Sequence, residues 1–230
     1  MVPSVYVAFD TTDIAKARTW AAAVAPHVAG IKLGLEFVYA QGMAGVRDLA
    51  GAVPLFLDLK LHDIPNTVAG GLHAVLEQIT PQYINVHAGG GPEMLRRAAE
   101  TVAEGSNGKT RLLAVTVLTS LDEDDLTAVG QRGPAANQAL RLAELAKRQG
   151  CHGVVCSPAE VSMLRQAMGL DFDLVVPGIR PAGAGAQDQK RIMTPSDAMI
   201  AGATALVIGR PITAAADPAE AARAIAASLA

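Results

Sequence analysis

The stretch LFLDLKLHD, residues 55–63, places a leucine at every second position from its start. Successive side chains of a β-strand point to opposite faces, so this pattern predicts a strand with two different faces. The face of leucines is expected to pack against helices. The other face carries Phe56, Asp58, Lys60 and His62, and is expected to point into the interior. Asp58 and Lys60 then stand side by side on the inner face.

Further short apolar runs occur along the whole chain, and longer stretches with helical spacing separate most of them. The eight expected strands cover residues 5–9, 31–35, 54–59, 83–87, 111–118, 152–156, 174–176 and 205–208. Expected helices include residues 14–25, with Thr12 or Asp13 as N-cap, 94–103 and 137–149. Strands that alternate with helices indicate a parallel sheet. Eight such units in 230 residues predict an α/β fold, a closed (β/α)8 TIM barrel, with residues 1–230 as a single domain.

The composition is typical of a globular protein with a sizeable core. Half of the residues are hydrophobic and 18% are charged, which argues against disorder. The net charge of -3 gives no support for nucleic-acid binding, since such surfaces are usually basic. We expect no signal peptide and no membrane-spanning segment. The two cysteines, Cys151 and Cys156, fit neither a disulfide framework nor a zinc site. We therefore expect both to be buried in a cytoplasmic protein.

Charged residues also reach the inner face of two neighbouring strands. Lys32 shares the inward phase of its strand with Gly34, and Asp10 ends the first strand in the inward phase. An isolated Asp-x-Lys pair is explained by an ion pair that fills the barrel, because buried charges are costly unless they are paired. Asp10, Lys32, Asp58 and Lys60 at one mouth are unusual for a purely structural core. We therefore predict a site for chemistry there.

Two segments after the seventh and eighth strands have the features of a phosphate site. They are PGIRP, residues 177–181, and the pair Gly209-Arg210. The loops that follow these two strands often bind phosphate in barrels of this class. Glycine lets the backbone approach an anion, and the arginine fork can hold it. Ordinary turns are the alternative explanation. The Gly- and Ala-rich residues 181–187 fit either a surface connection or a lid over a ligand.

These residues together resemble the orotidine 5'-monophosphate decarboxylase family, over nearly the full chain. The central match is DLKLHDIPNT, residues 58–67. The Asp-x-Lys-x-x-Asp core is shared with sugar-phosphate decarboxylases and hexulose-phosphate synthases, whereas IPNT and PGIR point to the orotidylate branch. Val176 stands where a threonine is common in the family. Further matches are VAFD (7–10), IKLG (31–34), VHA (86–88), VTVLTS (115–120), DQKR (188–191) and GR (209–210).

The resemblance implies decarboxylation of orotidine 5'-monophosphate to uridine 5'-monophosphate, the last step of de novo UMP synthesis, without cofactor or metal. It implies that Lys60 protonates C6 of the pyrimidine and that Asp58 disfavours the substrate carboxylate. Lys32 and Asp63 would complete an alternating Lys-Asp-Lys-Asp array. The family's shared site also implies a homodimer, in which Asp63 and Thr67 reach the partner's site.

The resemblance further implies which residues hold the rest of the substrate. Asp10 and Lys32 would bind the ribose hydroxyls, and Thr119, with Ser120 as the alternative, would contact the pyrimidine. The other substrate-binding residues are Ile64 and Pro177 around the base, Gln189 between lid, phosphate and base, and Arg180, Gly209 and Arg210 at the phosphate.

Two alternative functions stay open from the sequence. The first is a metal-dependent sugar-phosphate enzyme of the same superfamily, with His62 and His87 as candidate ligands. We expect His62 to be a hydrogen-bonding neighbour of the charged array instead. The second is a phosphate-ligand binding protein without turnover. Response to a chelator separates the first alternative, and turnover separates the second. The remaining histidines, His27, His73 and His152, are interpreted as surface or packing residues.

Overall fold

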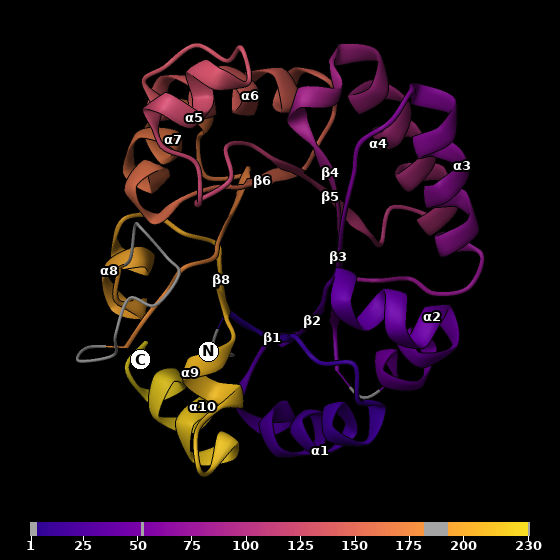
Figure 1. Cartoon of the computed structure of the whole chain (residues 1–230), viewed down its shortest axis with the longest axis vertical. Coiled ribbons are helices and arrows are strands. Elements are labelled where there is room, and N and C mark those ends of the chain that lie inside the picture. Colours follow the sequence, from indigo (N-terminus) through magenta and orange to yellow (C-terminus); the bar gives the residue numbers. More distant parts are fainter. Residues whose placement is uncertain (1–3, 52, 182–192, 230) are drawn as a thin grey trace.

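A ring of strands enclosed by helices forms the body of the protein (Figure 1). The computed structural model describes residues 4–51, 53–181 and 193–229. Within these residues, eight parallel strands close into a barrel in chain order, which confirms the predicted TIM barrel. The strands are β1 (Val5–Phe9), β2 (Gly30–Leu33), β3 (Leu55–Leu61), β4 (Tyr83–His87), β5 (Arg111–Val115), β6 (Gly153–Val155), β7 (Asp173–Val176) and β8 (Ala205–Ile208).

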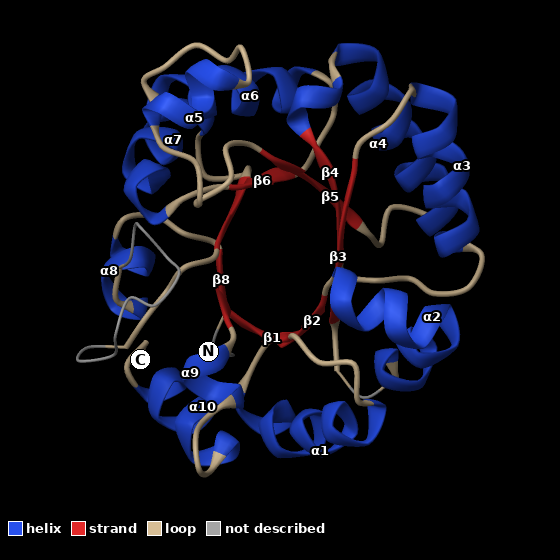
Figure 2. Ribbon diagram, in the orientation of Figure 1, coloured by secondary structure: helices blue, strands red, loops and turns tan. Residues whose placement is uncertain are grey.

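Helices cover the outside of the ring (Figure 2). The Asp13 carboxylate begins α1 by accepting hydrogen bonds from the backbone N–H groups of Ala15 and Lys16. Proline at the first position starts α3, α4 and α10, where its missing N–H costs nothing. The helices are α1 (Ile14–Val24), α2 (Leu35–Ala50), α3 (Pro65–Leu76), α4 (Pro92–Ser106), α5 (Glu123–Ala128), α6 (Ala135–Arg148), α7 (Val161–Met168), α8 (Pro195–Ile200), α9 (Arg210–Thr213) and α10 (Pro218–Ala227).

Several elements end earlier than the sequence predicts. The second strand stops at Leu33 because α2 already begins at Leu35. The fifth strand stops at Val115, where its pairing with the short β6 ends. The first helix ends at Val24, and Pro26 continues it as a short 3-10 turn. Of the two N-cap candidates, Asp13 is the residue that caps.

The apolar side chains form two separate cores. The larger core lies between strands and helices and includes Leu55 and Leu57, as the alternation in β3 predicts. The smaller core fills the inside of the barrel, and Tyr6, Phe56 and Tyr83 meet there edge to face, with ring centroids 5.5 to 6.3 Å apart. These rings pack against one another in the amino-terminal half of the barrel, because each belongs to the first two residues of its strand.

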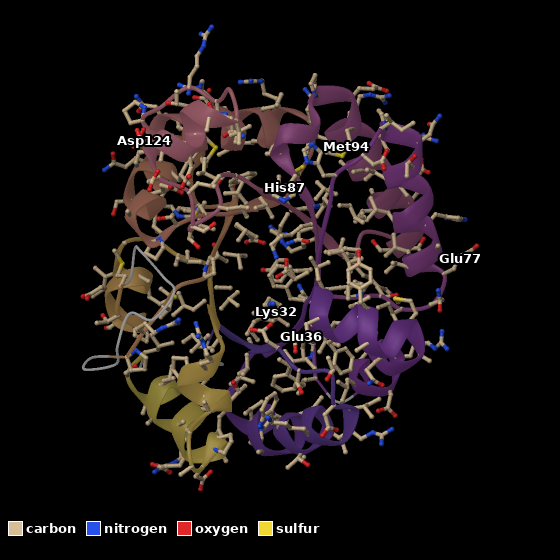
Figure 3. The ribbon with its side chains drawn as sticks, in the orientation of Figure 1. Lys32, Glu36, Glu77, His87, Met94 and Asp124 are labelled. Atoms are coloured by element: carbon tan, nitrogen blue, oxygen red, sulfur yellow. The ribbon has the colours of Figure 1, made fainter. Side chains whose placement is uncertain are left out.

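A hydrogen bond and an ion pair connect the first residues of β4, β5 and β7. The Tyr83 hydroxyl donates to Asp173 Oδ2 at 3.2 Å, and Arg111 forms an ion pair with the same oxygen. Figure 3 places Lys32 inside the ring, whereas Glu77 and Asp124 lie at the periphery. Among the helices of the described residues, none is both long and apolar enough to cross a membrane.

Candidate active site

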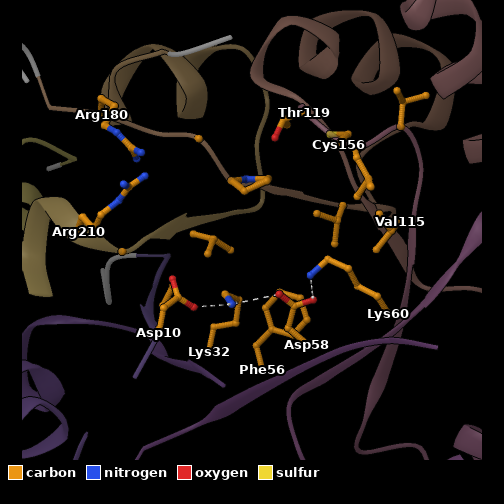
Figure 4. Close-up of a pocket in the computed structure, with 18 residues that line it drawn as sticks. Asp10, Lys32, Phe56, Asp58, Lys60, Val115, Thr119, Cys156, Arg180 and Arg210 are labelled. Carbon is orange, nitrogen blue, oxygen red and sulfur yellow. Dashed lines mark hydrogen bonds and ion pairs between the residues drawn. The ribbon is translucent and has the colours of Figure 1, made fainter. Parts of the chain in front are cut away.

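A cavity of about 270 Å³ opens at the carboxyl ends of the strands, the end at which barrels of this class carry their sites (Figure 4). Its wall has a polar and an apolar part. The polar part includes Asp10, Lys32, Asp58, Lys60, Thr119, Arg180 and Arg210, and the apolar part includes Val115, Val117, Val155, Pro177 and Val207. The cavity therefore offers charges at its floor and mouth and apolar contacts along one wall.

Four charged side chains form a continuous row on the cavity floor, with Lys32 on β2, Asp58 and Lys60 on β3, and Asp10 directly after β1. Lys60 Nζ donates to Asp58 Oδ1 at 2.6 Å. Lys32 Nζ lies 3.1 Å from Asp58 Oδ2 and 3.8 Å from Asp10 Oδ1. The structure thus brings together the four residues that the alternation and the strand order predict. Figure 4 shows the row from Asp10 to Lys60 as an unbroken line of contacts.

Burial changes along the row, and with it the strength of the interactions. The Asp58 side chain is 9% exposed, whereas that of Asp10 is 61% exposed. Burial by itself raises the pKa of Asp58, but the charges of Lys32 and Lys60, together with hydrogen bonds from Lys60 and Asn85, outweigh it and lower that pKa to about 2. Asp58 is therefore a buried carboxylate that stays ionised, and it can act electrostatically on a bound group.

Two arginines converge at the side of the cavity away from Lys60. In Figure 4 the guanidinium groups of Arg180 and Arg210 point toward one another. Arg180 is buried, and its Nε has no hydrogen-bond partner within the described part of the chain. Burial and the neighbouring Arg210 charge both lower the pKa of Arg180. A bound anion would satisfy the orphaned donor and reduce the repulsion.

Backbone geometry supports this arrangement. Gly178, which follows Pro177 and precedes Arg180 by two residues, has φ +77°. Residues with a β-carbon rarely adopt this backbone conformation. Gly209 precedes Arg210 and lies close to β1, where a β-carbon would stand 3.4 Å from that of Ala8. The path of the chain beside the two arginines therefore favours glycine at position 178, whereas a β-carbon at position 209 would make an ordinary van der Waals contact.

The remaining predicted residues separate into two groups. Thr119 and Pro177 line the cavity, whereas Ser120 is exposed and lies outside the described lining. Asp63, Ile64 and Thr67 are exposed and do not reach the described wall of this chain's own cavity. Asp63 and Ile64 belong to a separate shallow depression with His62, Pro65, Gly89 and Gly90. Gln189 and the 182–187 part of the Gly- and Ala-rich loop lie outside the described residues.

Asn85 on β4 is a polar residue of the site that the sequence reasoning missed. It is fully buried, and its amide Nδ2 donates to Asp58 Oδ1 at 2.7 Å. The available signal was a lone amide between the apolar Ile84 and Val86, in the inward phase of the strand.

The histidines and cysteines take no part in the described cavity wall except for Cys156. The rings of His62 and His87 lie 5.4 Å apart, and no group of three or more potential ligands suited to a metal occurs among the described residues. Both cysteines are buried, as predicted, and burial raises the pKa of each thiol, that of Cys151 to about 12. His152 is a packing residue whose Nδ1 accepts the backbone N–H of Leu112.

Comparisons with known proteins agree on one family. The family model "Orotidine 5'-phosphate decarboxylase / HUMPS family" matches residues 3–225. A protein of Thermobifida fusca named orotidine 5'-phosphate decarboxylase is 52% identical over 231 residues, covering 100% of this chain and 97% of its own length. A relative of the same name from Rhodospirillum rubrum is 52% identical and covers 96% and 92%.

A solved structure gives the same result at the level of the fold. The crystal structure of orotidine 5'-phosphate decarboxylase from Lactobacillus acidophilus superposes with a TM-score of 0.84 at 37% identity, covering 100% of this chain and 99% of that chain. The charged row, the paired arginines and these full-length matches lead to one assignment. The chain belongs to the orotidine 5'-phosphate decarboxylase / HUMPS family.

Proposed function

We propose that this protein decarboxylates orotidine 5'-monophosphate to uridine 5'-monophosphate and carbon dioxide, the last step of de novo UMP synthesis. The observation that carries the proposal is the Lys32–Asp58–Lys60 row on the floor of a cavity that has Arg180 and Arg210 at its other side. Relatives that match the full chain carry the name of this activity. The composition and the two free, buried cysteines support a cytoplasmic reaction.

Lys60 stabilises and then protonates the carbanion in the proposed mechanism. Loss of carbon dioxide leaves a lone pair in the plane of the pyrimidine ring, which the π-system cannot delocalise. A preorganised positive charge beside C6 is then the principal source of stabilisation. The Lys60 ammonium, held 2.6 Å from Asp58, supplies that charge and donates its proton to C6. This step requires no electron sink, and we propose that the reaction uses no cofactor.

Asp58 acts on the ground state. Because its pKa is lowered to about 2, its negative charge persists next to the substrate carboxylate. The repulsion disappears as neutral carbon dioxide leaves, so it favours the transition state over bound substrate. Lys32 offsets the cost of bringing two carboxylates together.

Binding of the phosphate aligns the substrate in the cavity. Arg180 and Arg210, with the Gly209 backbone, bind it, and Gln189 links it to the base. Asp10 and Lys32 hold the ribose, and Thr119 and Pro177 contact the base. Ile64 lies outside this chain's own described cavity wall, so its contact with the base would be made in the partner's site, beside Asp63. Binding energy from these remote contacts can align the substrate and exclude water at C6.

A second subunit completes the site in this proposal. Asp63 and Thr67 are exposed in the single chain and lie away from its own described cavity wall, which fits residues that serve a partner. We propose a homodimer in which Asp63 of each chain extends the other chain's Lys-Asp-Lys row, and Thr67 contacts the other chain's substrate.

The direct test is the ultraviolet absorbance of orotidine 5'-monophosphate after addition of purified protein, with and without a chelator. Conversion to uridine 5'-monophosphate at equal rates in both samples is expected. Folded protein that gives no conversion would contradict the proposal. Loss of conversion in the chelator would favour a metal-dependent reaction.

A further inference from the structure

Strands β3 and β4 do not run in even register at the active site. Leu57 pairs with Ile84, but the next pairing joins Leu61 to Val86. Residues 58–60 of β3 therefore lie against the single residue Asn85 of β4. Such a bulge bends the strand and leaves backbone groups without their ladder partners.

Lys60 has an unusual backbone conformation within this bulge. Its φ is +50°, in the left-handed region. A residue with a β-carbon is disfavoured there, and persists only where its surroundings hold it. The conformation determines where the Lys60 side chain leaves the strand, and hence where its ammonium lies relative to Asp58.

The side chain of Asn85 replaces the missing ladder bond. Its Oδ1 accepts the backbone N–H of Lys60 at 2.7 Å, and its Nδ2 donates to Asp58 Oδ1 at 2.7 Å. The direction of both bonds is fixed, because a backbone N–H only donates and an ionised carboxylate only accepts. One amide thus contacts both partners of the shortest ion pair in the charged row.

Asn85 makes these contacts from behind the site. Its side chain is fully buried, and it is not part of the described cavity wall. A buried amide has to find its hydrogen-bond partners within the protein. These two bonds therefore fix the orientation of the Asn85 side chain. Within the described part of the chain, Asn85 therefore reaches the site through its bonds to Asp58 and Lys60.

We propose that Asn85 is a positioning residue, which holds the Lys60 backbone in its left-handed conformation and orients the Asp58 carboxylate for the reaction. The proposal rests on the proposed decarboxylation for its kinetic consequence. Its structural consequence, the conformation of Lys60, does not depend on what the substrate is.

Two substitutions separate the two hydrogen bonds. Asn85→Ala removes both bonds, and Lys60 is expected to lose its positive φ. Asn85→Asp has nearly the same shape, keeps an acceptor for the Lys60 N–H and replaces the donor to Asp58 by a repelling oxygen. In that variant we expect Lys60 to keep its positive φ while Asp58 turns away. Crystal structures of both variants measure this directly.

The kinetic expectation is a change in kcat rather than in KM. Hydrogen bonds to charged groups imply that kcat of Asn85→Ala falls by about 10- to 100-fold. KM should change by less than about 3-fold, because the residues proposed to hold phosphate and ribose are untouched. Thr110→Val is the matched control. Thr110 is also fully buried, and its hydroxyl donates to the Pro81 carbonyl at 2.7 Å at the far end of the barrel.

The outcomes separate the two proposals. Positive φ retained at Lys60 in Asn85→Ala would overturn the positioning role, whatever the activity. An equal loss of kcat in Thr110→Val would also overturn it, because the effect would then be one of general stability. If Asn85→Ala does not fold, Asn85→Asp decides by the Asp58 orientation and by kcat. Failure of the unaltered protein to convert orotidine 5'-monophosphate refutes the proposed function alone, and the structures still decide on Asn85.

Discussion

Gly34 lies directly against the ammonium of Lys32. A β-carbon at Gly34 would stand 3.1 Å from Lys32 Nζ and 3.9 Å from Asp10 Oδ1. Lys32 has little freedom to move away, because its ammonium lies 3.1 Å from the buried carboxylate of Asp58. The glycine therefore provides the space in which the charged row is assembled.

Gly34→Ala should lower kcat/KM by about 10-fold, because a shift of a few tenths of an ångström displaces a group that acts by its position. Steady-state kinetics measure the change. Gly51→Ala is the control, since a β-carbon there meets nothing within 4 Å and its φ of -84° suits alanine. Equal rates for Gly34→Ala and the unaltered protein would show that the row tolerates displacement.

The ion pairs of Asp58 should make the free energy of unfolding decrease as the pH falls below about 4. Its pKa is lowered from 3.8 to about 2 in the folded protein, so its contribution is fully present above pH 4 and is lost as pH falls toward 2. This contribution is about 2 kcal/mol. Chemical denaturation from pH 2 to 6 should show a steeper loss in the unaltered protein than in Asp58→Asn. Equal pH dependence in the two proteins would mean that Lys32 and Lys60 do not stabilise the ionised Asp58 carboxylate.

Arg210→Ala should lower kcat/KM for orotidine 5'-monophosphate by about 100-fold or more, although Arg210 lies at the side of the cavity away from Lys60. The loss should vanish with the nucleoside orotidine, which lacks the phosphate. Comparing both substrates in both proteins measures this difference. An equal loss with orotidine would place Arg210 in a role other than phosphate binding.

Lys60→Ala and Asp63→Asn should each abolish most turnover as homodimers, by about 1000-fold for the lysine. Mixed and reassociated, they should regain activity, since each hybrid dimer then contains one intact site. Random pairing restores about a quarter of all sites. Activity that stays at the level of the separate variants would contradict a site shared between subunits.

Tyr83→Phe should lower stability without affecting catalysis. The substitution removes the hydroxyl that donates to Asp173 at 3.2 Å and should lower the free energy of unfolding by about 1 kcal/mol. Denaturant titration measures this loss, and the decarboxylation rate at 25 °C serves as the control. A reduced rate would show that the two ends of the barrel are coupled.

The barrel and most of the charged row were predictable because both follow from local pattern. Period-two alternation assigns Asp58 and Lys60 to one face, and the order of parallel strands brings Asp10 and Lys32 beside them. The positions of Arg180 and Arg210 follow from the strands that precede them. These inferences need no knowledge of the detailed backbone.

The features that escaped prediction depend on backbone irregularity or on contacts across the barrel. Alternation assumes an even strand, so it cannot reveal the bulge at Lys60 or the demand that this bulge places on Asn85. The Arg111–Asp173 ion pair joins residues of β5 and β7, whose side chains meet only after the barrel closes. The partner contacts proposed for Asp63 and Thr67 concern a surface beyond the single chain, and only the family resemblance pointed to them.

The rings of Tyr6, Phe56 and Tyr83 pack together inside the barrel, and the described cavity opens at the carboxyl ends of the strands. Substrate would then enter, and the nucleotide product leave, through this same opening. Product has to leave the cavity before the next substrate molecule can bind. Uridine 5'-monophosphate should therefore compete with orotidine 5'-monophosphate for binding. The packed rings thus restrict the route of ligands without taking part in the chemistry.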